Sequence, residues 1–238
     1  MQFLWEGLRQ AIRLILHGDP TIVHLTEVTL EVAAVSTTIA LILGLPVGLA
    51  LGLGTFPGRR TGLAVANAGL GLPPVVVGLG LALLMFPQSL LGSLHLLFTL
   101  KGVFVAQTVL DLPIVIALTA AAVQSVPAGL LDQARAFGAG TRQVWLLALR
   151  EARVGVLAAA IAAVGSALSE VGAVVLVGGN IEGSTQTLAS AALFQVNAGR
   201  FAQGMATGIV LLGLILLVAA ALTLAQQPGA RLRLRAPS

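Results

Sequence analysis

The chain has 238 residues, of which 57% are apolar and only 9% are charged, and its mean hydropathy is +1.00. Charge-free apolar runs longer than ~18 residues exclude an ordinary soluble domain and predict transmembrane helices. The absence of cysteine excludes disulfides and thiolate metal sites. The net charge of +4 and the pI near 11.3 could suggest nucleic acid. However, the arginines lie at the ends of the apolar runs, where they orient a membrane protein, so we expect no nucleic-acid partner.

Residues 1–24 combine an apolar helical stripe with charged side chains turned away from it. The stripe is Trp5, Leu8, Ile12 and Ile15, and the charged residues are Glu6, Arg9 and Arg13. This pattern predicts an amphipathic helix in the extracytoplasmic membrane interface, or alternatively a helix packed on the rim of a bundle. The segment lacks a basic start and a small-residue cleavage site, so we do not expect a signal peptide.

Five apolar runs follow, each close to the ~20 residues that a hydrocarbon core requires. They cover about Val32 to Leu53, Leu63 to Phe86, Val103 to Val126, Val154 to Val177 and Met205 to Ala225. The sequence therefore predicts an all-α, polytopic membrane protein with five transmembrane helices. We place the transmembrane region at residues 25–230, with a loop at residues 128–153, and a basic tail at residues 231–238 that rests on anionic headgroups.

Basic residues predict the orientation of these spans. Nine of them lie in one set of connecting segments and four in the other. The nine are Arg59, Arg60, Arg135, Arg142, Arg150, Arg153, Arg231, Arg233 and Arg235, and the four are Arg9, Arg13, Lys101 and Arg200. Because basic residues accumulate on the cytoplasmic side, we expect a multi-pass protein of the cytoplasmic (inner) cell membrane. Its N-terminus would lie outside, and its C-terminus and the loop at residues 128–153 would lie inside.

Small residues and prolines indicate how the spans pack. Gly44, Gly48 and Gly52 repeat every four residues and line one helix face, which favours close helix pairing in lipid. Pro73 and Pro74 predict a broken or loosely wound helix, which inside a membrane commonly lines a cavity or moves. Ordinary helix packing is the alternative for both features.

The loop from Leu130 to Arg153 is a polar, helical insert between two apolar runs. Leu130, Ala134, Phe137 and Gly138 can share one helical face, and Asp132 lies in the first turn, where it favours the helix dipole. A short helix with an apolar ridge can insert into a groove on a partner. A merely amphipathic surface helix is the alternative.

Several stretches resemble the permease subunits of ATP-binding-cassette (ABC) importers for tungstate, molybdate and sulfate. Asp132 to Ala139 is similar to the family's coupling motif, E-A-A followed by glycine, with Asp in place of Glu and Gln in place of the first Ala. Ala167 to Ala192 resembles the G-E-x-G-A and G-N-I-x-G-x-T-x-T-L stretch of the molybdate and sulfate permeases, and Leu72 to Leu84 their Pro-Pro-led span. Leu90 to Val115 looks most like the tungstate branch. Together these stretches cover about two-thirds of the chain, in the family's order.

The resemblance implies a permease that works by alternating access with several partners. These are a second copy of itself, cytoplasmic ABC ATPase subunits and an extracytoplasmic oxyanion-binding protein, within membrane lipid. Asp132, Ala134, Phe137 and Gly138 would couple the chain to the ATPase. Lys101, the single lysine, lies in no G-x-x-x-x-G-K-[ST] loop. We therefore expect no enzyme activity and no cofactor here, with ATP and Mg²⁺ bound by the partner ATPase, and the histidine spacing predicts no metal site.

An anion pathway favours neutral donors and helix ends over fixed acids. Gly179, Asn180, Ser184, Thr185 and Thr187 supply such donors near the outer end of the fourth span, so they join Pro73, Pro74 and Glu170 as candidates for the pathway or outer gate. A hydrated capping loop is the alternative. Asp111 and Glu170 are acids roughly 12–15 Å below the outer surface, where buried charges are costly. Gate bracing, pathway lining and proton coupling remain open for them, and a proton-coupled secondary transporter is the alternative function.

Overall fold

The computed structural model describes residues 2–226, so the predicted basic tail at 231–238 lies outside the described residues. Every regular element among residues 2–226 is a helix, which confirms the all-α prediction. The helices are α1 (Gln2–Leu16), α2 (Pro20–Leu53), α3 (Arg59–Gly69), α4 (Pro74–Met85), the 3₁₀ turn η1 (Gly92–Leu94), α5 (Leu100–Gln124), α6 (Ala128–Ala136), α7 (Thr141–Glu151), α8 (Arg153–Ser169), α9 (Gly172–Gly178), α10 (Leu188–Asn197) and α11 (Phe201–Gln226).

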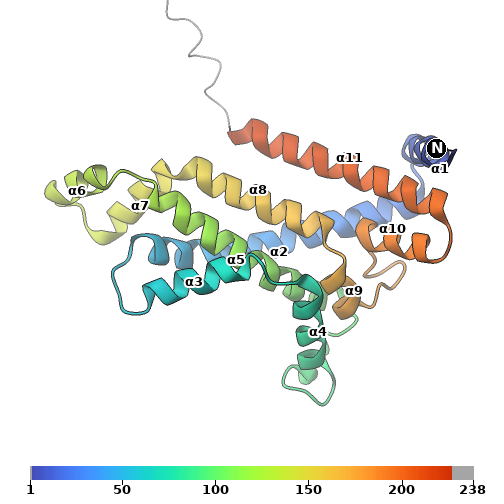
Figure 1. The fold of residues 1–238 in the computed structure, drawn as a ribbon, viewed down its shortest axis with the longest axis horizontal. Coiled ribbons are helices and arrows are strands. Elements are labelled where there is room, and N and C mark those ends of the chain that lie inside the picture. The colour runs from blue at the N-terminus through green and yellow to red at the C-terminus, as the bar shows by residue number, and fades with distance from the viewer. Residues whose placement is uncertain (1, 227–238) are drawn as a thin grey trace, which may run out of the picture.

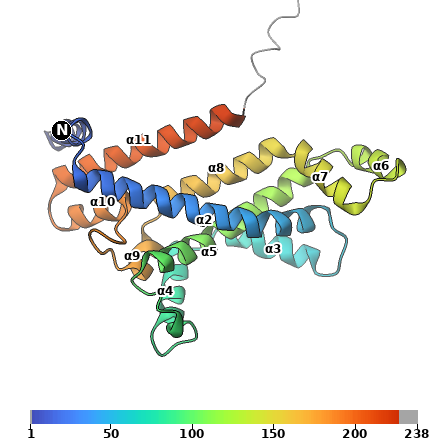
Figure 2. The same ribbon diagram turned by 180° about the vertical axis from the view of Figure 1, so that it is seen from behind.

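The molecule is an elongated bundle in which α2, α5, α8 and α11 run along the long axis (Figure 1). The helices α6 and α7 form one end, and α1 and α10 lie at the opposite end. The helix α4 projects from the side of the bundle and packs against α9 at its base. Seen from behind, α2 runs from the end that carries α1 towards the end that carries α7 (Figure 2). The predicted coupling segment, in α6 and α7, and the predicted amphipathic helix α1 therefore lie at opposite ends of the bundle.

Within residues 2–226, three helices are long and apolar enough to cross a membrane by themselves: α2, α5 and α11 over Phe201–Leu224. Two bent pairs pass the same test together, α3 with α4 at 103° and α7 with α8 at 69°, which gives up to five spans. The predicted number of spans therefore holds only if each bent pair counts as one.

The first predicted span, from about Val32, starts too late. α2 begins at Pro20, because the Asp19 side chain accepts hydrogen bonds from Thr21 N and Ile22 N, and proline is favourable in the first helical turn. Its 34 residues reach about 51 Å, well beyond a ~30 Å hydrocarbon core. The preceding helix α1 ends at Leu16, and the side chain of Ile15 in the predicted stripe lies outside the described ones.

The second and fourth predicted spans are not continuous helices. The second breaks between Gly69 and Pro74, where Pro73 is extended (ψ 120°) because a residue before proline avoids the helical region. The fourth ends at Ser169, and Glu170 is extended (ψ 133°) before α9 begins at Gly172. Glu170 therefore lies at a helix break rather than within a span.

The predicted glycine face is confirmed as the contact between α2 and α5. A Cβ at Gly44 would lie 2.8 Å from Val115 Cγ1, and one at Gly48 would lie 2.7 Å from Thr119 Cβ. Gly52 meets α5 in the same way at Val123. Close approach of the two backbones is what small residues permit in membrane helices.

Candidate functional site

The predicted coupling segment folds as α6, a tight turn and α7. Gly138 has φ +87°, a conformation that glycine adopts without a steric cost. Gly138 N donates to Arg135 O at 2.9 Å, and Ala139 N donates to Ala134 O at 3.0 Å. This pair of bonds is the Schellman motif that ends many helices. The helix end therefore requires Gly138, and Ala134 contributes its carbonyl.

A buried apolar cluster joins this segment to the spanning helices. Leu131 on α6 and Val144 and Ala148 on α7 are buried together with Leu49 of α2 and Val123 of α5. The cluster therefore connects α6, through α7, with the ends of α2 and α5. Sequence reasoning missed Leu131, although it follows Leu130 in the same apolar pair.

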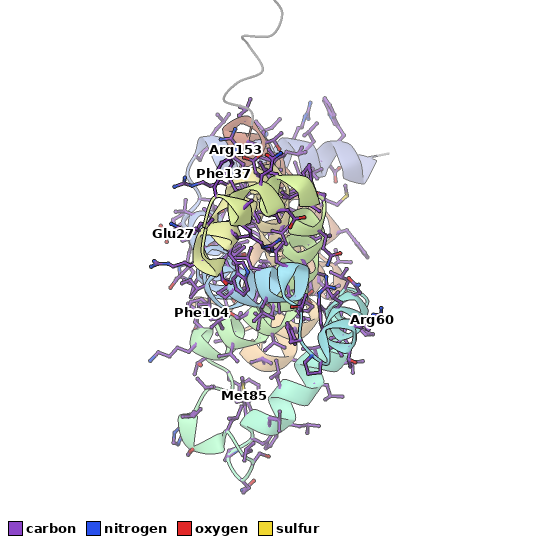
Figure 3. The ribbon with its side chains drawn as sticks, turned by 90° about the vertical axis from the view of Figure 1, so that its left-hand side faces the viewer. Glu27, Arg60, Met85, Phe104, Phe137 and Arg153 are labelled. Atoms are coloured by element: carbon purple, nitrogen blue, oxygen red, sulfur yellow. The ribbon has the colours of Figure 1, made fainter. Side chains whose placement is uncertain are left out.

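The tip of the segment faces away from the chain. Phe137 is 91% exposed, and a Cβ at Gly138 would have no neighbour within 4 Å. Figure 3 shows Phe137 at the α6–α7 end of the bundle. The single face expected from Leu130 to Gly138 does not form, because α6 ends at Ala136 and Phe137 is its C-cap. Asp132 forms an exposed ion pair with Arg135 (2.6 Å), a contact of small energetic weight.

A groove of about 510 Å³ lies beside this tip. Its walls come from the end of α2 and from the α6–α7 turn, and include Thr55, Arg135, Ala139, Val144 and Trp145. The surface therefore combines a protruding aromatic ring with an adjacent concavity, which is the form of a protein docking surface.

Two glycines bring α4 and α9 together next to the Pro73–Pro74 break. A Cβ at Gly78 would lie 2.6 Å from Ala173 Cα, and one at Gly172 would lie 2.6 Å from Val75 Cγ2. Glu170 Oε1 accepts a hydrogen bond from Ala173 N at 3.1 Å and so satisfies a donor at the start of α9. Both helix breaks, at Pro73 and at Glu170, thus flank one tightly packed contact.

Asp111 is fully buried between α2 and α5. Gln107 Nε2 donates to Oδ1 at 3.0 Å, while Ser36 Oγ and Thr37 Oγ1 donate to Oδ2 at 3.3 and 3.4 Å. Sequence reasoning missed the partners, although Gln107 lies one helical turn before Asp111.

The predicted outer-gate segment divides into exposed and buried residues. Gly179 and Ser184 are exposed, and Asn180 is partly buried in a left-handed conformation (φ +51°). Thr185 Oγ1 donates to Gly178 O (2.6 Å) and accepts from Ile181 N (3.0 Å). Thr187 caps α10 by accepting from Ser190 N. The two threonine hydroxyls are thus engaged within the chain, and Asn180 Oδ1 is buried with no partner among the described residues.

The bent and straight apolar helices define an all-α, multi-pass membrane protein. Residues 44–232 match the family model for the binding-protein-dependent transport system inner membrane component, and the chain belongs to this family. It is 40% identical over 221 residues to a probable anion ABC transporter permease protein of Haloferax volcanii, covering 91% of this chain and 92% of that protein.

The chain is also similar to two further permease proteins and to one solved transporter structure. The tungstate uptake system permease protein TupB of Peptoclostridium acidaminophilum is 30% identical, with 89% of this chain and 93% of the relative covered. The molybdenum transport system permease protein ModB of Azotobacter vinelandii is 32% identical, with 81% and 90% covered. The inward-facing MetNI methionine ABC transporter superposes with a TM-score of 0.69 at 24% identity, covering 87% of this chain and 95% of that chain, and this likeness concerns the fold alone.

Proposed function

We propose that the chain is the permease subunit of an ATP-driven importer of a tetrahedral oxyanion, with tungstate as the preferred substrate. The observation that carries this proposal is similarity along nearly the whole chain to permeases named for anions and for tungstate. A relative named for molybdenum is also similar, so the preference for tungstate over molybdate is the finer part of the proposal.

The proposed assembly contains two copies of the chain, two cytoplasmic ATPase subunits and an extracytoplasmic oxyanion-binding protein. ATP and Mg²⁺ bind to the ATPase subunits. The tip at Phe137 and Gly138 docks on the ATPase, which is supported by its exposure and by the adjacent groove. When the ATPase subunits close, α6 moves, and the buried cluster around Leu131 carries the movement into α2 and α5.

The opposite part of the pathway opens and closes at the contact between α4 and α9. The helix breaks at Pro73–Pro74 and at Glu170 supply the places where the backbone can bend. Glu170 braces this contact through Ala173 N rather than binding the substrate, because a carboxylate repels an oxyanion. Gly179, Asn180 and Ser184 form the outer rim of the pathway.

Transport by the purified system tests the function. The chain, its ATPase and its binding protein are reconstituted in vesicles, and uptake of labelled tungstate is measured with and without ATP. We expect ATP-dependent uptake that excess molybdate inhibits more strongly than sulfate, and no uptake when the binding protein is omitted. Uptake by the chain alone, driven by a pH gradient, would refute the proposal.

The proposed orientation can be tested separately because the chain has no cysteine. Phe137→Cys and Ser184→Cys place single thiols at two exposed positions, one in the α6–α7 turn and one in the loop before α10. A membrane-impermeant maleimide added to intact cells should label the variant at position 184 and leave the one at position 137 unlabelled until the cells are opened. The reverse pattern would overturn the cytoplasmic position of α6.

A further inference from the structure

We propose that α1 lies flat in the phospholipid interface of the membrane, with its apolar stripe of Trp5, Leu8, Ile12 and Leu16 inserted among the lipids. The partner of this surface is the membrane itself. The proposal concerns a surface that the transport mechanism does not use, and it is independent of the substrate.

One face of α1 is occupied by the chain's own α11. A Cβ at Gly7 would lie 2.8 Å from Met205 Cβ and 3.7 Å from Ala202 O, so the two helices approach closely at this glycine. Gly7 is buried, whereas the residues on either side of it in the stripe are not. The packing on α11 therefore fixes the direction in which the rest of α1 points.

The stripe itself has no cover within the chain. Trp5 is 58% exposed, Ile12 is 48% exposed and Leu16 is 76% exposed, with Leu8 at 38%. Exposed large apolar side chains in a row on one helix are unfavourable in water and typical of an interfacial helix. The Arg9 guanidinium lies 5.3 Å from the Trp5 ring centroid, and Arg13 is exposed one turn further on. A tryptophan beside cationic side chains fits the zone where headgroups meet acyl chains.

The position of α1 on α11 sets its depth. Over Phe201–Leu224, α11 has a mean hydropathy of 2.7, and only 11% of that window is buried in the chain. Its first residues therefore mark where the hydrocarbon begins, and α1 contacts α11 at Ala202 and Met205, in its first turns. In Figure 1 α1 is seen nearly along its axis while α11 runs across the picture, and Figure 3, turned by a quarter, shows α1 lengthwise. A helix that crosses the spans at this level lies in the plane of the interface.

The short link to α2 keeps the end of α1 close to the start of α2. Three residues, His17 to Asp19, join α1 to α2, with Gly18 at φ +59° and Asp19 capping α2. α1 is therefore tied to one spanning helix by covalent connection and to another by packing. Interfacial insertion of the stripe would hold the ends of α2 and α11 at a constant depth while the opposite end of the bundle moves.

Tryptophan fluorescence tests the proposal in the full chain. The sequence has two tryptophans, and Trp145→Phe leaves Trp5 as the single emitter. The variant is reconstituted in vesicles of phosphatidylcholine brominated either near the headgroup or near the chain end. Because interfacial helices insert only ~5–10 Å into the headgroup–acyl boundary, we expect bromine near the headgroup to quench Trp5 about twofold more strongly than bromine near the chain end. Aqueous acrylamide should quench weakly.

Each contrary result overturns the proposal in a distinct way. Stronger quenching from the chain ends would show that α1 spans the membrane. Strong acrylamide quenching would place the stripe in water, and shielding from both lipid and acrylamide would show that a second copy or another protein covers it. Leu8→Gln combined with Leu16→Gln should abolish the quenching by lipid while sparing the Gly7 contact. Arg13→Gln, on the polar side of the same helix, is the matched control and should leave the quenching unchanged.

Discussion

The substitution Asp111→Leu should destabilise the fold, because it removes the acceptor at the centre of the polar cluster between α2 and α5. Three neutral donors converge on this carboxylate, from Gln107, Ser36 and Thr37. Leucine has no hydrogen-bonding group, and the cluster is closed to water, since Ser36, Gln107 and Asp111 have no exposed surface. The donors would therefore remain buried without this acceptor.

The size of the effect follows from how many donors lose their only partner. Ser36 Oγ also donates to Val32 O at 2.7 Å, so it stays paired. Gln107 Nε2 and Thr37 Oγ1 are left, and each buried unpaired group costs about 1–3 kcal/mol, or about 2–6 kcal/mol together. Hydrogen bonds between membrane helices average only ~0.6 kcal/mol, because the unfolded chain in lipid also finds partners. We therefore expect a loss of about 2 kcal/mol, at the lower end of that range.

Asp111→Asn is the matched control. The asparagine oxygen can accept hydrogen bonds from Ser36 and Thr37. Gln107 Oε1 is buried with no partner among the described residues. If the Gln107 amide turns over, this oxygen can accept a hydrogen bond from the asparagine NH₂. The number of unpaired groups is then unchanged, so stability should stay within about 1 kcal/mol of the original. Unfolding in mixed micelles, followed by helical circular dichroism, measures the difference. The reasoning is refuted if the leucine variant unfolds at the same midpoint as the original chain, or if asparagine is as damaging as leucine.

Three further predictions concern the helix contacts and the coupling tip. Gly48→Ala places a Cβ 2.7 Å from Thr119 on α5 and should cost about 1–3 kcal/mol. As the control, Gly80→Ala on α4 places a Cβ with no neighbour within 4 Å and should be neutral or stabilising by up to about 1 kcal/mol. Equal melting midpoints for the Gly48→Ala and Gly80→Ala variants would contradict this prediction. Gly138→Glu should leave the chain inserted but lower oxyanion uptake per ATP hydrolysed. Gly199→Glu is the control, because Gly199 also has a positive φ and open surroundings but lies before α11, away from the coupling tip. It should leave the uptake per ATP hydrolysed unchanged. An equal loss in both variants would show that backbone strain alone causes the effect. Glu170→Leu should speed hydrogen exchange at Ala173 N–H, whereas Glu170→Gln keeps the accepting oxygen, and unchanged protection in the leucine variant would remove the bracing role.

Local sequence signals predicted the parts of the fold that depend on local chemistry. The apolar runs indicated helices in a membrane, because an unpaired backbone group in lipid costs several kcal/mol and a helix satisfies its own groups. The spacing of Gly44, Gly48 and Gly52 predicted a contact face, which α5 occupies. The coupling segment was also placed between two spans from its charges alone, although the role of its residues remains a prediction.

Hydropathy could not locate the breaks, because a run of apolar residues reads the same whether or not the helix continues. The outcome at Glu170 depends on a hydrogen bond to Ala173 N and on the packing of Gly172 against α4. The break at Pro73 follows from the local Pro73–Pro74 pair, but the packing of α4 after it depends on the contact of Gly78 with α9, which begins about a hundred residues later in the sequence. A local window contains the Glu170–Ala173 pair but not the contacts between α4 and α9.

The sequence by itself determined that this protein is a helical membrane protein, since composition and charge placement are properties of the chain in order, and its motifs resembled those of the permease family to which it belongs. The tertiary structure decided which side chains are available. It turned the hydroxyls of Thr185 and Thr187 inward, left Phe137 exposed, and gave Asp111 partners on α2 that lie more than seventy residues away. The physical reason is that the availability of a polar or aromatic group depends on what packs beside it, and those neighbours come from distant parts of the chain.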